Sequence, residues 1–129
     1  MNAYNKKRIL VVDDEPVICQ LCRRVLTEED FEVDIAPDGK VAKAIISERR
    51  YGLYLFDIKM PAVSGKELYI WLQKRYPSDA GRVVFITGSA IGQNTESFLQ
   101  NSGRQVLRKP FTTEELKATV SQDLKAVYE

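Results

Sequence analysis

The chain has no histidine and only two cysteines among its 129 residues, and these shortages disfavour two kinds of site. A structural zinc site needs four nitrogen or sulfur ligands, which the pair Cys19 and Cys22 cannot supply alone. Their C-x-x-C spacing leaves a thioredoxin-like redox pair as an alternative. A redox pair has its first thiol at a helix start, whereas Cys19 follows the predicted helix start at Pro16 by about one turn.

Long hydrophobic runs and an excess of charge of one sign are also missing. No apolar run approaches the roughly 20 residues of a membrane span, and the polar segment Met1–Arg8 lacks the apolar region of a secretory signal. The 19 basic and 18 acidic residues leave a net charge of +1, which gives no reason to expect nucleic acid or a membrane as a partner. We therefore expect a cytoplasmic protein.

The chain length fits a single domain, 1–129, that can bury a core without disulfides or a metal. Short apolar runs rich in β-forming residues predict buried strands at 7–12, 53–56, 82–86 and 105–108, and alternation predicts a strand nearer the sheet edge at 31–35. Apolar residues at helical spacing, including Val17 and Ile18 in the first helix and Val41 in the second, predict five helices. The fourth is expected at about Asn94 to Ser102. This alternation favours an α/β fold with a parallel sheet covered on both faces.

Polar and charged residues stand where four of the predicted strands end. Asp13 and Asp14 follow the first strand, Asp57 the third, Thr87 the fourth and Lys109 the fifth. The carboxyl ends of parallel strands meet at one edge of a sheet, so these side chains should gather there. Crowded carboxylates favour a divalent cation, and hard oxygen ligands suit Mg²⁺. Lys109 and Thr87 could contact a phosphate, and Asp57 is the best candidate for a nucleophile toward phosphorus.

Four segments together resemble the receiver domain of two-component response regulators. They are Ile9–Pro16, Phe56–Pro61 with Ser64-Gly65 following, Ile86–Gly88 and Lys109–Phe111. The resemblance covers about residues 7–127. It implies a flavodoxin-like (βα)5 doubly wound parallel sheet of strand order 2-1-3-4-5. It also implies a phosphoacceptor that assists its own phosphorylation and dephosphorylation and signals by conformational change, rather than an enzyme.

The resemblance also implies a role for each site residue. Asp57 would accept a phosphoryl group from a histidine kinase or phosphotransfer protein. Asp14 and Asp57 would bind Mg²⁺ directly, Asp13 would act mainly through water, and the backbone carbonyl of Lys59 would be a further ligand. An unknown downstream protein would then respond to the phosphorylated domain.

At the other two strand ends, the resemblance makes Thr87 the switch hydroxyl and Lys109 the phosphate-contacting lysine. The Lys109–Pro110 peptide bond would be cis. The start of the first helix, at Ile18 and Cys19, and the loop at Pro110 and Phe111 would meet the phosphodonor.

One position departs from the usual family pattern. Receivers commonly have Phe or Tyr three residues before the final lysine, where this chain has Val106. A β-branched valine has few rotamers and no ring to swing inward, so we expect movement of the segment 88–103 instead. In form the chain resembles receivers attached to hybrid histidine kinases more than those fused to DNA-binding outputs.

Two other classes of protein remain as alternatives. A Mg²⁺-dependent phosphohydrolase with an aspartyl-phosphate intermediate would also use Asp57. Such enzymes usually have a second general acid two residues after the nucleophile, where this chain has Lys59. A thioredoxin-like protein would instead use Cys19 and Cys22.

Overall fold

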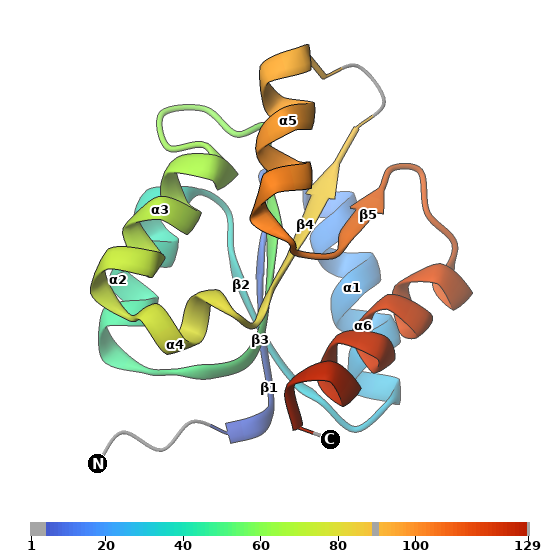
Figure 1. Ribbon diagram of the computed structural model, residues 1–129. Helices are drawn as coiled ribbons and strands as arrows, with labels where there is room; N and C mark the ends of the chain where they lie inside the picture. Colours follow the sequence, from blue (N-terminus) through green and yellow to red (C-terminus); the bar gives the residue numbers. More distant parts are fainter. Residues whose placement is uncertain (1–4, 89–90, 129) are drawn as a thin grey trace.

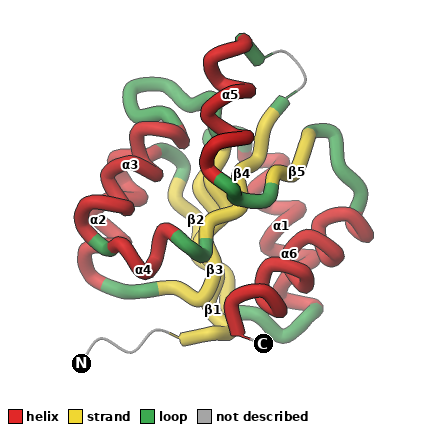
Figure 2. Tube along the Cα trace, viewed as in Figure 1, coloured by secondary structure: helices red, strands yellow, loops and turns green. Residues whose placement is uncertain are grey.

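A five-stranded parallel sheet of order β2-β1-β3-β4-β5 forms the centre of the computed structural model, which describes residues 5–88 and 91–128. Helices cover both of its faces, as Figures 1 and 2 show. The order confirms the predicted flavodoxin-like fold. The strands are β1 Asn5–Val12, β2 Glu32–Ala36, β3 Tyr51–Asp57, β4 Val83–Thr87 and β5 Val106–Arg108; the helices are α1 Pro16–Glu28, α2 Gly39–Glu48, α3 Gly65–Arg75, α4 Pro77–Ala80, α5 Gln93–Ser102 and α6 Thr113–Tyr128.

The central strands are buried on both faces, which explains their continuous apolar sequence. Successive side chains of a strand point to opposite faces. In β1, Leu10 and Val12 pack in the core under α2, α3 and α5, whereas Ile9 and Val11 pack in the core under α1 and α6. This two-layer burial fixes the register of the sheet, because a slip of one residue would exchange the two sets of side chains.

The start of α3 lies directly on the end of β3. Ser64 and Glu67 form a capping box, in which each side chain accepts a hydrogen bond from the other's backbone N–H. The Gly65 N–H donates to the Ile58 carbonyl at 3.0 Å, and a Cβ at Gly65 would lie 2.3 Å from the Asp57 carbonyl oxygen. Glycine is therefore required here by close approach of the backbone, and it sets the position of the loop that follows Asp57.

Three sequence predictions need correction, and two reach beyond the described residues. Val17 and Val41 are not core residues, because their positions on α1 and α2 leave them 74% and 38% exposed. The five predicted helices become six, because Pro77 begins the short helix α4 directly after α3. The predicted single domain and the segment 88–103 that is predicted to move include residues 1–4, 89–90 and 129, which lie outside the described part of the chain.

A buried carboxylate connects α4 to β3 and β4. Asp79, 1% exposed, accepts hydrogen bonds from Arg50 and from the Tyr54 hydroxyl, and it lies 3.0 Å from the Arg82 guanidinium. Burial alone would raise the pKa of Asp79, but these partners outweigh burial and hold the pKa below its ordinary value. The ionised carboxylate is thus the form that the fold stabilises.

We predict that Asp79→Asn lowers the free energy of unfolding by about 3 kcal/mol at pH 7, because it leaves buried guanidinium groups without their anion. The pKa of Asp79 is lower in the folded than in the unfolded chain. Its contribution is therefore present above about pH 4 and is lost as the pH falls through the folded-state pKa. Urea unfolding of parent and variant between pH 7 and pH 3 should show the difference narrowing only at the acidic end.

The control for Asp79 is Glu96→Gln, which removes an exposed ion pair with Arg108. Exposed pairs contribute less than about 1 kcal/mol, so this variant should unfold almost as the parent does. Equal losses in the two variants would contradict the structural role assigned to Asp79.

Candidate functional site

Acidic side chains from two strand ends meet at the carboxyl edge of the sheet. Asp13, Asp14 and Glu15 follow β1, and Asp57 ends β3; each offers an oxygen, and these oxygens all lie within 4.8 Å of one another. Asp13 and Asp57 are buried, whereas Asp14 and Glu15 are exposed. The strand order explains the meeting, because β1 and β3 are neighbours in the sheet.

Lys109 brings a positive charge to this cluster from the end of β5. Its Nζ lies 3.1 Å from Asp13 Oδ2 and 3.6 Å from Asp57 Oδ1, and it also donates a hydrogen bond to Glu15. The Lys109 N–H donates to the Thr87 carbonyl at 2.7 Å, which fixes the end of β5 against the end of β4. The Lys109–Pro110 peptide bond is cis, as the resemblance to receiver domains implied.

Burial and crowding change the acidity of these groups. Burial, reinforced by the charge of Asp13, raises the pKa of Asp57 to about 7, although Lys109 opposes the shift. Burial also raises the pKa of Asp13. Burial would lower the pKa of Lys109, but its contacts with Glu15 and Asp13 outweigh burial and raise that pKa. The cluster therefore has more negative charge than one lysine neutralises, and a bound cation would favour the ionised form of Asp57.

A cavity of about 520 Å³ opens directly over Asp57. Asp14, Glu15 and Lys109 line one part of its wall, and Lys59 and Gly88 also line it. Thr87 is buried at the end of β4, and its hydroxyl donates to the Gly88 carbonyl at 3.3 Å. The structure thus brings Asp13, Asp14, Asp57 and Lys109 together and places Lys59 at the cavity wall, and the Thr87 hydroxyl points to its own loop.

Glu15 belongs to this site, although it was not among the predicted site residues. Its carboxylate is close enough to the three aspartates to share a cation with them, and it holds Lys109. The signal in the sequence was its place as the third consecutive acid at a strand end. Residue type alone could not show that its side chain turns toward β5, since β5 lies far away along the chain.

The structure does not support a redox site at the cysteines. Cys19 and Cys22 are buried free thiols, and the Cys19 thiol donates to the Asp13 carbonyl at 3.2 Å. Burial and the charge of Asp13 raise the pKa of Cys19 to about 11 and that of Cys22 to about 12. A redox-active cysteine needs a lowered pKa, so these thiols belong to the core.

The fold and site define a class: doubly wound α/β domains with an acidic cluster and a lysine at the carboxyl edge of the sheet. The sequence model of the response regulator receiver domain family matches residues 9–121 of the chain. The chain belongs to this family. It is therefore a signalling domain of two-component systems. Receiver domains generally have histidine kinases as partners and are generally not enzymes. The acidic cluster is typical of the family's Mg²⁺ site.

Curated relatives carry similar domains in longer chains. The transcription factor SKN7 of Candida albicans is 31% identical over 119 residues, which cover 92% of this chain and 21% of that protein. The transcriptional regulatory protein TcrA of Mycobacterium tuberculosis is 32% identical over 111 residues, covering 86% and 43%. The chain thus spans from about a fifth to less than half of these relatives.

Solved structures share the whole fold. A CheY-like receiver domain protein from Methanospirillum hungatei is 31% identical with a TM-score of 0.83, covering 93% of this chain and 94% of that one. The receiver domain of a histidine kinase from Syntrophus aciditrophicus is alike in fold, with a TM-score of 0.82, 24% identity and coverage of 95% and 92%.

Within the described residues, no helix is both long and apolar enough to span a membrane.

We predict that a divalent cation stabilises the folded domain, because it reduces the repulsion among the carboxylates of the acidic cluster. In EDTA, Asp57→Asn should unfold at a higher temperature than the parent, because the variant has one negative charge fewer in the buried cluster. Millimolar Mg²⁺ should raise the unfolding temperature of the parent more than that of the variant, since binding to the folded state stabilises it by mass action. Thermal unfolding followed by circular dichroism measures both effects.

Asp34→Asn is the control, because Asp34 lies on β2 and pairs with Arg49 outside the acidic cluster. This variant should respond to Mg²⁺ as the parent does. An equal Mg²⁺ shift in parent and Asp57→Asn would show that the cluster does not bind the cation.

Proposed function

We propose that this domain accepts a phosphoryl group on Asp57 from a histidine kinase or a histidine phosphotransfer protein. The observation that carries the proposal is the position of the buried Asp57 carboxylate, which faces an open cavity between an acidic cluster and Lys109. In the transfer, an Asp57 oxygen forms a bond to phosphorus as the phosphorus–nitrogen bond of the donor histidine breaks. The histidine nitrogen keeps the electron pair of that bond.

Each neighbouring residue has a defined part in this proposal. Asp14 and Asp57 would hold Mg²⁺ directly, Asp13 would act mainly through water, and the Lys59 carbonyl would be a further ligand. When bound, Mg²⁺ supplies charge neutralisation to the phosphoryl oxygens. Lys109 lies 3.6 Å from Asp57 and could turn its ammonium group from the carboxylates to a phosphoryl oxygen.

The phosphohydrolase alternative has less support. A general acid two residues after Asp57 would be needed to protonate a leaving group, and the residue there is the exposed Lys59. Lys59 carries an amine at the position where such enzymes have that acid. The site is therefore better suited to accepting one phosphoryl group than to turnover of small substrates.

Incubation with Mg²⁺ and acetyl phosphate should add a single phosphoryl group to the parent chain, as measured by intact mass. Asp57→Asn should gain none, because an amide cannot act as the nucleophile. Asp14→Ala should lose at least about tenfold in rate, since the carboxylate that positions the cation is gone. Asp34→Asn is again the matched control, and phosphorylation of Asp57→Asn at the parental rate would refute the acceptor assignment.

Two of the residues predicted to meet the phosphodonor, Ile18 and Cys19, are poorly placed for contact with a partner. Ile18 is partly buried against the core under α1 and α6, and Cys19 is buried, so neither offers an open apolar surface. The preceding residue, Val17, is 74% exposed in the first turn of α1, close to the acidic cluster along the chain. We propose that Val17, with the exposed Pro110 and the partly buried Phe111, contacts the donor protein.

Val17→Ala should slow phosphotransfer from a phosphorylated histidine-containing donor protein several-fold, because contact area at the docking surface is lost. Its rate with acetyl phosphate should not change, since that donor needs no docking surface. Val41→Ala removes the other exposed valine, on α2, and should leave both rates at the parental level. Equal slowing by Val17→Ala with both donors would rule out a docking role.

For the response to phosphorylation, we propose movement of α5 and the loop before it. Val106 is partly buried against the core beside α5, together with Ile91 and Phe98, and only Leu99 of α5 is fully buried. A Cβ at Gly88 or Gly92 would meet no other atom within 4 Å, so there is open space beside these two residues. A Thr87 hydroxyl that leaves the Gly88 carbonyl for a phosphoryl oxygen would shift this weakly held segment.

Amide hydrogen exchange with and without beryllofluoride tests this proposal. Protection should change at 87–88 and 91–102 by at least about threefold, because these residues have few buried anchors. The central strand β3 away from Asp57 should serve as the internal control. Unchanged exchange across 87–102 would refute the proposed movement.

We also propose that the chain is of the subtype found in hybrid histidine kinases. The support is Val106 at the position where receivers commonly have an aromatic residue. Similar domains also occur in longer transcription regulators. We therefore propose that the response to phosphorylation comes from a separate protein or from another domain.

A further inference from the structure

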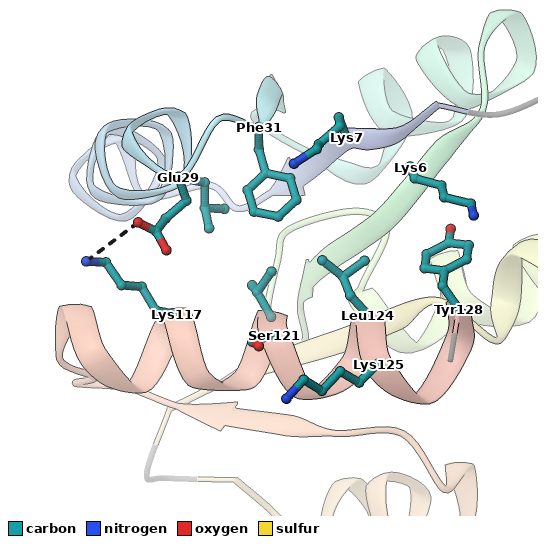
Figure 3. A pocket seen from close by; sticks show the side chains of 11 residues that line it. Lys6, Lys7, Glu29, Phe31, Lys117, Ser121, Leu124, Lys125 and Tyr128 are labelled. Atoms are coloured by element: carbon teal, nitrogen blue, oxygen red, sulfur yellow. Dashed lines mark ion pairs between the residues drawn. The ribbon is translucent and has the colours of Figure 1, made fainter.

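A groove of about 400 Å³ lies at the edge of the sheet opposite to the acidic cluster. One wall is α6, and the other is formed by the end of α1 and by the chain at the starts of β1 and β2 (Figure 3). Strand starts and strand ends lie at opposite edges of a parallel sheet, so this groove is separate from the phosphorylation site. Its floor is apolar, with Leu26 and Val120 buried and Phe31 and Leu124 partly buried.

Helix α6 presents two parallel rows of side chains along this groove. Residues four apart lie on the same side of a helix. Val120, Leu124 and Tyr128 form one row, which lines the apolar floor and its end. The second row, Lys117, Ser121 and Lys125, stands beside it at the rim, as Figure 3 shows.

The charge around the groove is strongly of one sign. Lys6 and Lys7 stand on the wall from β1, and Lys117 and Lys125 stand on the wall from α6, against the single acid Glu29 in the lining. Glu29 and Lys117 are 4.0 Å apart, and both side chains are at least 40% exposed, so the pair is weak. Lys7 lies over the Phe31 ring and Lys6 over the Tyr128 ring, at 5.4 and 4.8 Å. The aromatic rings thus hold these two amines at the groove.

We propose that this groove binds an acidic, amphipathic segment of a partner polypeptide. Lys117 and Lys125 are separated by eight residues of helix, about 12 Å along α6. A single anionic head group cannot reach both, whereas a row of carboxylates on one peptide can. The apolar floor lies below the rim, so an inserted side chain such as leucine would be covered and the carboxylates beside it would meet the lysines.

The proposal also gives the domain two sites of opposite charge. A phosphodonor would meet the acidic edge, and the acidic segment would bind at the far edge, so both could be bound at once. The groove is therefore suited to holding a partner in place while phosphotransfer takes place at Asp57, and its occupation does not depend on phosphorylation.

The experiment uses the full chain and a synthetic 18-residue peptide of leucine and glutamate, patterned as an amphipathic helix. Titration followed by ¹H–¹⁵N spectra should shift amides in 5–7, 29–31 and 117–128. Lys117→Glu with Lys125→Glu should weaken binding at least about tenfold, as reversal of close complementary charge does. Lys74→Glu, on α3, is the matched control and should bind as the parent does.

Two further probes separate the proposal from its competitors. A peptide of leucine and lysine with the same pattern should not bind, and vesicles containing phosphatidylserine should not compete with the acidic peptide. Shifts centred on 13–15 and 57–59, equal binding by the Lys117→Glu/Lys125→Glu variant, or binding of vesicles alone would overturn the proposal. Parental rates of acetyl phosphate labelling in that variant would show that the groove is independent of the acceptor site.

Discussion

The ion contacts of Lys109 are the interaction on which the carboxyl edge of the sheet depends. A buried carboxylate such as Asp13 or Asp57 would be costly without a cation, and Lys109 lies within 3.6 Å of both. The same residue holds the end of β5 to β4 through its backbone N–H. Lys109 therefore both balances charge in the site and joins the end of β5 to β4. One lysine does not neutralise all four carboxylates of the cluster.

Gly65 shows how the fold and the site constrain each other. The N–H of Gly65 reaches the Ile58 carbonyl only because no side chain separates α3 from the end of β3. That contact fixes the loop that carries Lys59 and Pro61, which form part of the cavity wall over Asp57. The geometry at the acceptor thus depends on a residue that has no chemistry of its own.

The sequence was a good guide wherever the pattern was local or repeated. The buried strands were predictable because they are apolar runs. The charged residues at the strand ends were predicted to meet because parallel strands end at the same edge of the sheet. The exposure of Val17 was not predictable from helical spacing, since it depends on how α1 lies on the sheet. The contact between Glu15 and Lys109 was equally hidden, because it joins residues 94 positions apart along the chain.

The net charge of +1 conceals a separation that only the fold reveals. At the carboxyl edge, four carboxylates stand around one lysine, and at the opposite edge four lysines stand around one glutamate. Such opposed clusters cancel in composition but not in space, because charges farther apart than a Debye length of about 8 Å act on separate ligands. A net charge near zero excludes one extended field of a single sign over the whole molecule. It does not exclude a cation at one edge and an acidic polypeptide at the other.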